Sequence, residues 1–290
     1  MNRKTFLQSV ISMTTIADLS DFNTFTAGLE TQSQLMPVLF IGHGSPMNGI
    51  EDNEFSKRWT RMASEIPTPR AILVVSAHWF TRGTRITAME KPQTIHDFGG
   101  FPPALFAVQY PSPGSPQLAK ETASMIHAAH VELDHDWGLD HGTWTVVRHM
   151  YPDAKIPVLQ LSIDYTKGPQ YHYDLAKELQ ALRRKGVLIM ASGNMVHNLR
   201  MISWPMINGG GYDWAMQMND TFKKLIQNGT HDSLIHYDRL GKDAQLAIPT
   251  PEHYLPLLYT LGLQGKDEAV SFFNDKAVGG SLTMTSVKIG

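Results

Sequence analysis

Apolar runs of strand length alternate along this chain with segments of helical period. The runs occupy residues 38–41, 71–80, 156–164 and 186–198. A strand that is buried on both faces is apolar throughout, and such strands are typical of parallel sheets covered by helices. The chain is therefore predicted to be an α/β protein with a central, largely parallel sheet flanked by helices.

Three segments between these runs have the period and the end signals of helices. They span residues 115–130, 168–186 and 212–229. In the first segment Ser115 is placed as an N-cap, and Pro116 occupies the first helical position, where a missing N–H is tolerated. The other two segments close at Gly186 and Gly229, and glycine readily adopts the conformation that ends a helix.

The domain organisation follows from length and from the absence of punctuation. The 290 residues contain no internal repeat and no convincing linker, so one domain over residues 37–290 is expected. Residues 1–36 begin with basic residues, but Gln8 and Ser12 interrupt the apolar stretch that follows, so they resemble an export signal only faintly. We expect a loosely ordered, polar N-terminal extension and a cytoplasmic protein, with export as the open alternative.

Composition excludes several classes of function. A net charge of −2 and the lack of any long Lys/Arg cluster argue against a nucleic-acid partner. No apolar stretch reaches the length of about 18 residues that a membrane span needs, so no membrane partner is expected. The chain has no cysteine, which excludes a disulfide framework, a thiolate nucleophile and cysteine-bound metals. Its 13 histidines favour imidazole and carboxylate chemistry.

Three predicted strands each carry a histidine at or just beyond the C-terminal end, namely His43, His78 and His197. In open α/β sheets the ligand crevice lies outside these strand ends, so the three should converge. A fourth candidate, His253, is expected to open a helix after Pro251. A single buried histidine usually makes a core hydrogen bond, but three in this position indicate a metal site. Without cysteine such a site suits Fe(II), Zn or Mn.

Eight of the remaining histidines divide into two groups. His141 and His96 lie in loops rich in glycine and aromatic residues, where active-site walls are often built, so both are candidate site residues. Surface or capping roles are expected for His127, His130, His172, His231 and His236, and a structural role is expected for His149.

Six motifs occur in order along the chain: GHGSPM, SAHWF, IHDFGGFP, WGLDHGTW, ASGNMVHN and PEHYLPLLY. Together they resemble the LigB-type, or class III, extradiol ring-cleavage dioxygenases, and within these the 4,5-DOPA extradiol branch. The resemblance covers about residues 36–290. It implies a single catalytic α/β domain over residues 37–290, with one divalent metal ion at the C-terminal ends of the strands.

The resemblance also implies a reaction and its partners. Both atoms of O2 would be inserted into the ring of a catechol such as L-DOPA, next to its hydroxyl pair. The product would be a seco-DOPA or muconic semialdehyde. The ion would be Zn²⁺ in the isolated protein or Fe²⁺ for turnover, and the protein would be a monomer or a small homo-oligomer.

Site residues carry over by motif. His43 and His78 match metal ligands, and His197 matches a histidine beside the metal that acts in acid–base chemistry and is near enough to be a ligand. His141 matches a second catalytic histidine that contacts the substrate and the oxygen region. His96, in the IHDFGGFP motif, is a further candidate for substrate binding.

The third metal ligand is where this chain departs from the better-studied members. Those members complete a two-histidine, one-carboxylate face with a glutamate. Here the PEHY segment offers both Glu252 and His253, and we follow the DOPA branch in expecting His253. An all-imidazole site leaves a full +2 charge on the ion, which a catecholate dianion would neutralise.

Two other classes of function stay open on the residues alone. A zinc-dependent hydrolase would use the same histidines with a metal-bound water and Glu252 as base, and would be indifferent to oxygen. A non-catalytic LigB-like binding protein is the second alternative. Such relatives tend to lose metal ligands, whereas this chain keeps the family's histidines.

Overall fold

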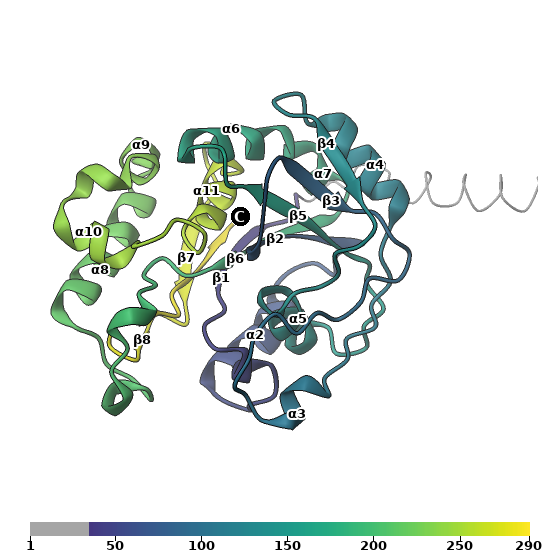
Figure 1. Ribbon diagram of the computed structural model, residues 1–290. Coiled ribbons are helices and arrows are strands. Elements are labelled where there is room, and N and C mark those ends of the chain that lie inside the picture. The colour runs from purple at the N-terminus through teal and green to yellow at the C-terminus, as the bar shows by residue number, and fades with distance from the viewer. Residues whose placement is uncertain (1–34) are drawn as a thin grey trace, which may run out of the picture.

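The computed structural model describes residues 35–290, which form an eight-stranded sheet with helices around it (Figure 1). Along the sheet the strand order is β4-β3-β5-β2-β6-β1-β10-β7. The strands are β1 (Val38–Gly42), β2 (Ala71–Thr81), β3 (Thr84–Thr87), β4 (Val131–Asp134), β5 (Val158–Asp164), β6 (Val187–Gly193), β7 (Val270–Phe273) and β10 (Ser286–Ile289). A separate antiparallel pair consists of β8 (Ala277–Val278) and β9 (Leu282–Thr283).

The four central strands β5, β2, β6 and β1 are parallel to one another. They are the four apolar runs of the sequence, and β1, β5 and β6 are buried along their whole length. Antiparallel pairing occurs toward the edges, where β10 pairs with β1 and β7, and β3 pairs with β5. The predicted α/β class with a largely parallel sheet is confirmed.

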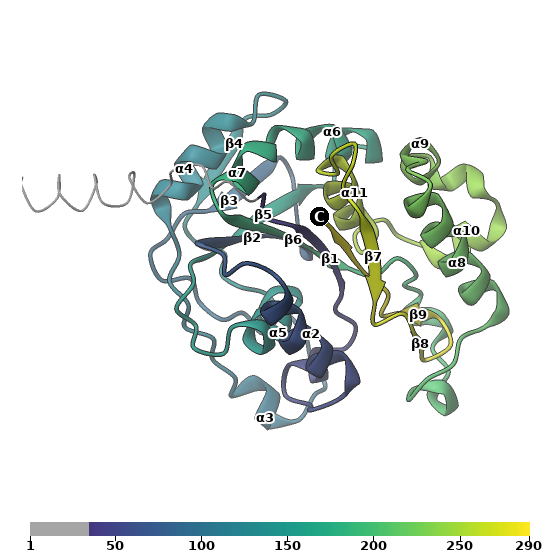
Figure 2. The same ribbon diagram turned by 180° about the vertical axis from the view of Figure 1, so that it is seen from behind.

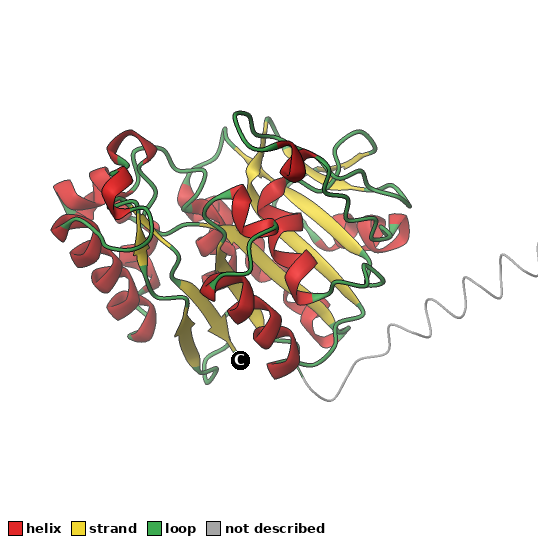
Figure 3. Cartoon of the chain, turned by 90° about the horizontal axis from the view of Figure 1, so that it is seen from below, coloured by secondary structure: helices red, strands yellow, loops and turns green. Residues whose placement is uncertain are grey.

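Two hydrophobic cores cover the two faces of the sheet, because side chains alternate along each strand. Leu39 and Ile41 of β1 face the core that contains Trp59 and Trp144, while Phe40 faces the other core. Figures 1 and 2 show α2 (Glu54–Glu65) and α5 (His141–Met150) together, and Figure 3 shows the strands at the centre with helices around them. The α-helices are α2 (Glu54–Glu65), α3 (Pro103–Phe106), α4 (Pro116–Met125), α5 (His141–Met150), α6 (Pro169–Glu178), α7 (Gln180–Arg184), α8 (Asp213–Gln227), α9 (His231–Ile235), α10 (Lys242–Ala247) and α11 (Leu255–Gly262). Short 3-10 helices are η1 (Pro46–Gly49), η2 (Leu199–Met201), η3 (Trp204–Met206) and η4 (Tyr237–Leu240).

The predicted helices exist, but some of their ends differ. Ser115 caps α4 as expected by accepting the backbone N–H of Leu118 at 3.2 Å, yet α4 ends at Met125 rather than at residue 130. The segment predicted as one helix over 168–186 is two helices, α6 and α7, which meet at Leu179.

Two predictions about individual histidines were wrong. His253 does not open a helix: it lies in the turn before α11, which begins at Leu255. His172 is neither a surface nor a capping residue. It is completely buried on α6, and its Nδ1 lies 3.0 Å from the Tyr259 hydroxyl. The structural role expected for His149 is confirmed by the 2.8 Å contact of its Nε2 with the Asn48 carbonyl oxygen.

The predicted extension over residues 1–36 lies outside the described residues except for its last two. Met36 is buried, and its carbonyl oxygen accepts a hydrogen bond of 2.8 Å from Nε of Arg183. Within the described part of the chain no helix is long and apolar enough to cross a membrane.

Candidate metal centre

His43 follows β1 directly, and its backbone N–H donates to the carbonyl oxygen of Gly193 at the end of β6 (3.2 Å). Its ring Nδ1 lies 3.0 Å from the Ser192 hydroxyl. That hydroxyl donates its own proton to the carbonyl oxygen of Gly142 at 2.6 Å. It must therefore accept from His43, which places the ring proton on Nδ1 and leaves a lone pair on Nε2.

His78 lies in β2, within a stretch where the pairing register with β5 shifts between Val75 and Phe80. Such an irregularity changes the direction in which the side chains of that stretch point. Its Nδ1 faces the Asp97 carboxylate, with Oδ2 at 3.4 Å. This contact is longer than a hydrogen bond, but an acceptor opposite Nδ1 favours the tautomer of His78 that has its lone pair on Nε2.

The Nε2 atoms of His43 and His78 lie 3.0 Å apart. Burial, followed by the neighbouring histidines, lowers the pKa of both rings well below the ordinary value, so both are neutral at pH 7. At this distance either one nitrogen donates a proton to the other or, where both carry lone pairs, a cation lies between them. Ligand nitrogens of a tetrahedral zinc site are about 3.3 Å apart for Zn–N bonds of about 2.0–2.1 Å, so the pair fits a metal ion.

His253 completes this group. Its carbonyl oxygen accepts the backbone N–H of Asn194 at 2.9 Å, which holds the turn against the end of β6. A Cβ atom on Gly193 would lie 2.1 Å from that oxygen, so only glycine permits this approach. Ligand atoms of His43, His78 and His253 all lie within 4.8 Å of one another. Three of the four residues predicted as ligands are therefore together, and a ligand atom of the fourth, His197, lies within 4.8 Å of one of His253.

Glu252 lies beside this group rather than in it. Its carboxylate accepts a hydrogen bond of 2.7 Å from the Thr250 hydroxyl and lies 3.6 Å from Nδ1 of His253. Partial burial raises its pKa, but the larger effect comes from His253 and Thr250 together, which lower it. The net pKa is about 2, so the carboxylate is ionised. Glu252 is within 4.8 Å of ligand atoms of His197 and His253, and the described residues form no such set that joins it to His43.

His197 stacks on the ring of His253. Its backbone N–H donates to the carbonyl oxygen of Ala247 at 2.8 Å, and the two imidazole rings stack with centroids 3.6 Å apart and planes 7° apart. Burial, followed by the neighbouring His253, lowers the pKa of His197 to about 2. The ring is therefore neutral at pH 7.

His141 is the first residue of α5 and lies beside His78, with ring centroids 3.8 Å apart. Asp97 accepts from both its backbone N–H and its Nδ1, each at 2.9 Å. The helix is capped by the buried Asp140, which accepts from the Ser76 hydroxyl at 2.7 Å. Burial, together with the charge of Asp97, raises the pKa of Asp140 to about 6.

The structure does not bring His96 into the cluster. Its Nε2 lies 3.1 Å from the carbonyl oxygen of Val108, and its ring contacts Phe98 with a centroid separation of 5.8 Å. Phe98 in turn lies 5.6 Å from the ring of His141. His96 is thus one aromatic layer behind the cluster, and its predicted role in substrate binding stays a prediction.

Sequence reasoning missed the partners of the histidines. Ser192 and Asp97 orient His43 and His141 across the fold, although Asp97 directly follows His96 in the IHDFGGFP motif and could have been noticed there. Asp140 could have been noticed as a helix N-cap in the WGLDHGTW motif.

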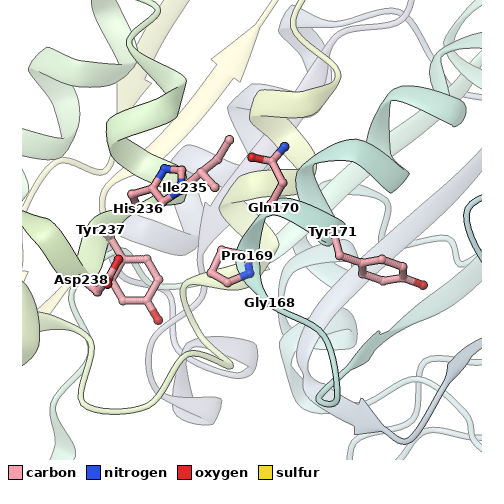
Figure 4. Close-up of a pocket in the computed structure, with 8 residues that line it drawn as sticks. All are labelled: Gly168, Pro169, Gln170, Tyr171, Ile235, His236, Tyr237 and Asp238. Atoms are coloured by element: carbon pink, nitrogen blue, oxygen red, sulfur yellow. The ribbon is translucent and has the colours of Figure 1, made fainter.

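A cavity of about 390 Å³ lies between the start of α6 and the segment that joins α9 to η4 (Figure 4). Pro169, Tyr171 and Tyr237 contribute its apolar surface, and His236 and Asp238 contribute polar groups. None of the clustered histidines lines it, so it is separate from the metal centre.

A largely parallel sheet with a histidine cluster at the C-terminal ends of its strands agrees with the family that the sequence matches. The chain belongs to the LigB family: residues 37–286 match the model described as the catalytic LigB subunit of aromatic ring-opening dioxygenase. The predicted enzyme class, an extradiol ring-cleavage dioxygenase, is confirmed.

Particular relatives support the same placement. The chain is 48% identical to the 4,5-DOPA dioxygenase extradiol of Escherichia coli K12, with 89% of this chain and 96% of that protein covered. It is 33% identical to the protein of the same name from Beta vulgaris, with 89% and 98% covered. A crystal structure of an uncharacterized protein from Escherichia coli K12 matches with a TM-score of 0.77 and 42% identity, covering 88% of this chain and 100% of that one.

Proposed function

We propose that this enzyme binds one divalent metal ion through His43, His78 and His253. The observation that carries this proposal is the 3.0 Å approach of the Nε2 atoms of His43 and His78, whose other ring nitrogens face acceptors. An ion held there supplies a Lewis acid that lowers the pKa of catechol hydroxyls and, as Fe(II), the electron chemistry that O2 requires. The imidazole set suits both Zn²⁺ and Fe²⁺.

We propose a catechol such as L-DOPA as the substrate and a seco-DOPA or muconic semialdehyde as the product. Two relatives that the chain covers over most of their length, at 48% and 33% identity, are named 4,5-DOPA dioxygenase extradiol. An all-imidazole ligand set adds no negative charge to the ion, which favours an anionic catecholate over a neutral ligand.

His197 is the proposed acid–base residue. Burial and His253 lower its pKa, so the ring is neutral at pH 7 and a weak base by itself. A catecholate bound beside it would favour the protonated ring, and this pairing is what we propose allows it to take a catechol proton and later return it. Its ring stacks on His253, and the described residues form no set of ligand atoms within 4.8 Å that joins it to His43 or His78. The second role that we propose, as a ligand when no substrate is present, therefore requires the ring to turn toward the ion.

His141 is the proposed second catalytic histidine. Asp97 accepts from its Nδ1, so Nε2 is the nitrogen left for the substrate or for oxygen. The nearby Phe98 ring supplies an aromatic wall beside it.

An anaerobic reconstitution with Fe²⁺, followed by L-DOPA and then oxygen, tests this function. The expected result is a yellow semialdehyde whose mass equals that of L-DOPA plus two oxygen atoms, formed only with oxygen. Activity with Zn²⁺ that is indifferent to oxygen would favour the hydrolase instead. Full metal loading without turnover of any catechol would contradict the assigned reaction.

A further inference from the structure

Asp97 lies between two histidines of the metal centre. Its Oδ1 accepts the backbone N–H of His141 and its Oδ2 accepts Nδ1 of the same residue, each at 2.9 Å. Oδ2 also lies 3.4 Å from Nδ1 of His78. Among residues 35–290 the ion pairs of Asp97 are with these two histidines alone.

The loop that carries Asp97 is fixed to the start of α5. The backbone N–H of Ile95 donates to the Leu139 carbonyl oxygen at 2.7 Å, and the indole N–H of Trp144 donates to the carbonyl oxygen of Ile95 at 2.9 Å. Ile95 therefore links the segment that carries Asp97 to residues before and after His141. Only 15% of the Asp97 side chain is exposed.

This geometry determines which ring nitrogen carries the proton. A carboxylate offers only acceptors, so each Nδ1 that faces it is a donor and each Nε2 keeps its lone pair. For His78 that lone pair is the one that faces Nε2 of His43. For His141 it is the nitrogen left for substrate or oxygen.

We propose that Asp97 is a positioning residue that sets the tautomers of His141 and His78 together, His141 through two bonds and His78 through the longer contact. Ligand atoms of His78, Asp97 and His141 also lie within 4.8 Å of one another. Both carboxylate oxygens already accept N–H groups of His141, so in this proposal Asp97 acts through the rings and not as a ligand of the ion. The proposal rests on the proposed function for its effect on turnover, but not for its effect on the tautomers.

Asp97→Asn is the sharpest test, because an amide cannot satisfy the donors that the carboxylate does. If its oxygen keeps the backbone N–H of His141, its NH2 group faces Nδ1 and favours protonation of Nε2 instead. If the amide is reversed, its NH2 group meets the backbone N–H. The ring can change its tautomer but the backbone N–H cannot lose its proton, so the first orientation, with the ring proton on Nε2, is the one expected.

Nitrogen-15 NMR of the histidine rings in the metal-free protein reads the tautomers directly. His141 is expected as the Nδ1–H form in the wild type and as the Nε2–H form in Asp97→Asn. Competition for Zn²⁺ against a chromophoric chelator is expected to show an affinity lower by about 10–100-fold, the usual cost of removing such a partner. Asp97→Glu, which keeps the charge, should recover part of this loss.

Asp134→Asn is the matched control. Asp134 is also a buried carboxylate that accepts backbone N–H groups, but its ion pair is with Arg85 and it touches no histidine of the centre. It should leave ring tautomers and Zn²⁺ affinity unchanged.

A double-variant experiment separates positioning from general damage to the fold. If Asp97 acts through His141, Asp97→Asn should lower kcat strongly in the wild type and only slightly in a His141→Gln background. An unchanged His141 tautomer, a Zn²⁺ affinity within twofold of wild type, or an equal loss of kcat in both backgrounds would overturn the proposal. A wild type that cleaves no catechol contradicts the proposed function alone, since the NMR and Zn²⁺ measurements need no turnover.

Discussion

The three proposed ligands differ in how their second ring nitrogen is held. His43 Nδ1 is 3.0 Å from the Ser192 hydroxyl, and His78 Nδ1 is 3.4 Å from the Asp97 carboxylate. His253 Nδ1 is buried and makes no hydrogen bond, with Glu252 the nearest carboxylate at 3.6 Å. His253 is thus oriented by its backbone and by the stacked His197 rather than by a strong ring partner.

A comparison of two substitutions decides which residue of the Glu252–His253 pair binds the ion. Loss of a residue that only contacts a metal ligand typically lowers metal affinity by about 10–100-fold. We expect Glu252→Gln to lower Zn²⁺ affinity within that range and His253→Gln to lower it by more. Metal per chain after dialysis, by elemental analysis, measures both, with His43→Ala as the positive control that should hold no stoichiometric metal. The reverse order would make the carboxylate the third ligand.

His197→Phe separates the two roles proposed for this residue, because phenylalanine keeps a ring to stack on His253. Loss of acid–base catalysis alone should lower turnover on the order of 10²–10⁴-fold with metal retained. Loss of a ligand should also weaken Zn²⁺ binding, and we expect both effects in part. His236→Phe serves as the control, because His236 is a half-buried histidine outside the cluster. Wild-type turnover on catechols in His197→Phe would refute a chemical role.

At the scale of elements, the centre depends on how closely the turn before α11 approaches the end of β6. Gly193 pairs with Gly42 of β1 in the sheet register and lies against the carbonyl oxygen of His253. The same strand end therefore supports the two segments that carry His43 and His253. A parallel sheet with a short turn packed on its edge can place imidazoles from distant segments together.

Gly193→Ala tests this approach. The added Cβ would meet the His253 carbonyl oxygen at 2.1 Å, so the turn must move away. We expect a loss of about 1–3 kcal/mol in the free energy of unfolding, as for other overpacked positions, together with weaker Zn²⁺ binding. Chemical denaturation and chelator competition measure the two effects.

Gly99→Ala is the control for that experiment, because a Cβ at Gly99 has nothing within 4 Å and its φ is not in the left-handed region. Equal stability and equal Zn²⁺ affinity for the two alanine variants would show that the contact at Gly193 does not position His253.

At the scale of the whole molecule, burying neutral histidines makes stability depend on pH. Burial lowers the pKa of His43, His78, His253 and His197, and it lowers that of His172 to about 4. Below the unfolded pKa of about 6.5 the unfolded chain binds protons that the folded chain excludes, so stability falls as the pH falls.

The metal-free protein should therefore lose thermal stability between about pH 6.5 and pH 4, with His172 alone contributing about 3 kcal/mol at the lower end. Calorimetry at a series of pH values measures this, and His172→Gln should show a shallower decline than the wild type. A Tm that does not change from pH 7 to pH 5 would contradict the neutral burial of these rings.

Much of the architecture could be read from the residues alone. The apolar runs at 38–41 and 186–198 are strands of a parallel sheet because a continuous apolar run suits a strand covered on both faces. His43 and His78 could be placed at one mouth because parallel strands end at the same edge. The motifs around them identified the family and the candidate ligands.

Only the tertiary structure decided how these side chains are oriented. Ser192 holds the ring of His43 from 149 residues along the chain, and Asp97 holds His141 from 44 residues away. Local period and end signals carry no information about such contacts. They likewise could not show that His172 is buried against Tyr259 while His96 lies behind Phe98. Proton placement on an imidazole depends on the atom opposite each nitrogen, and folding alone brings those atoms together.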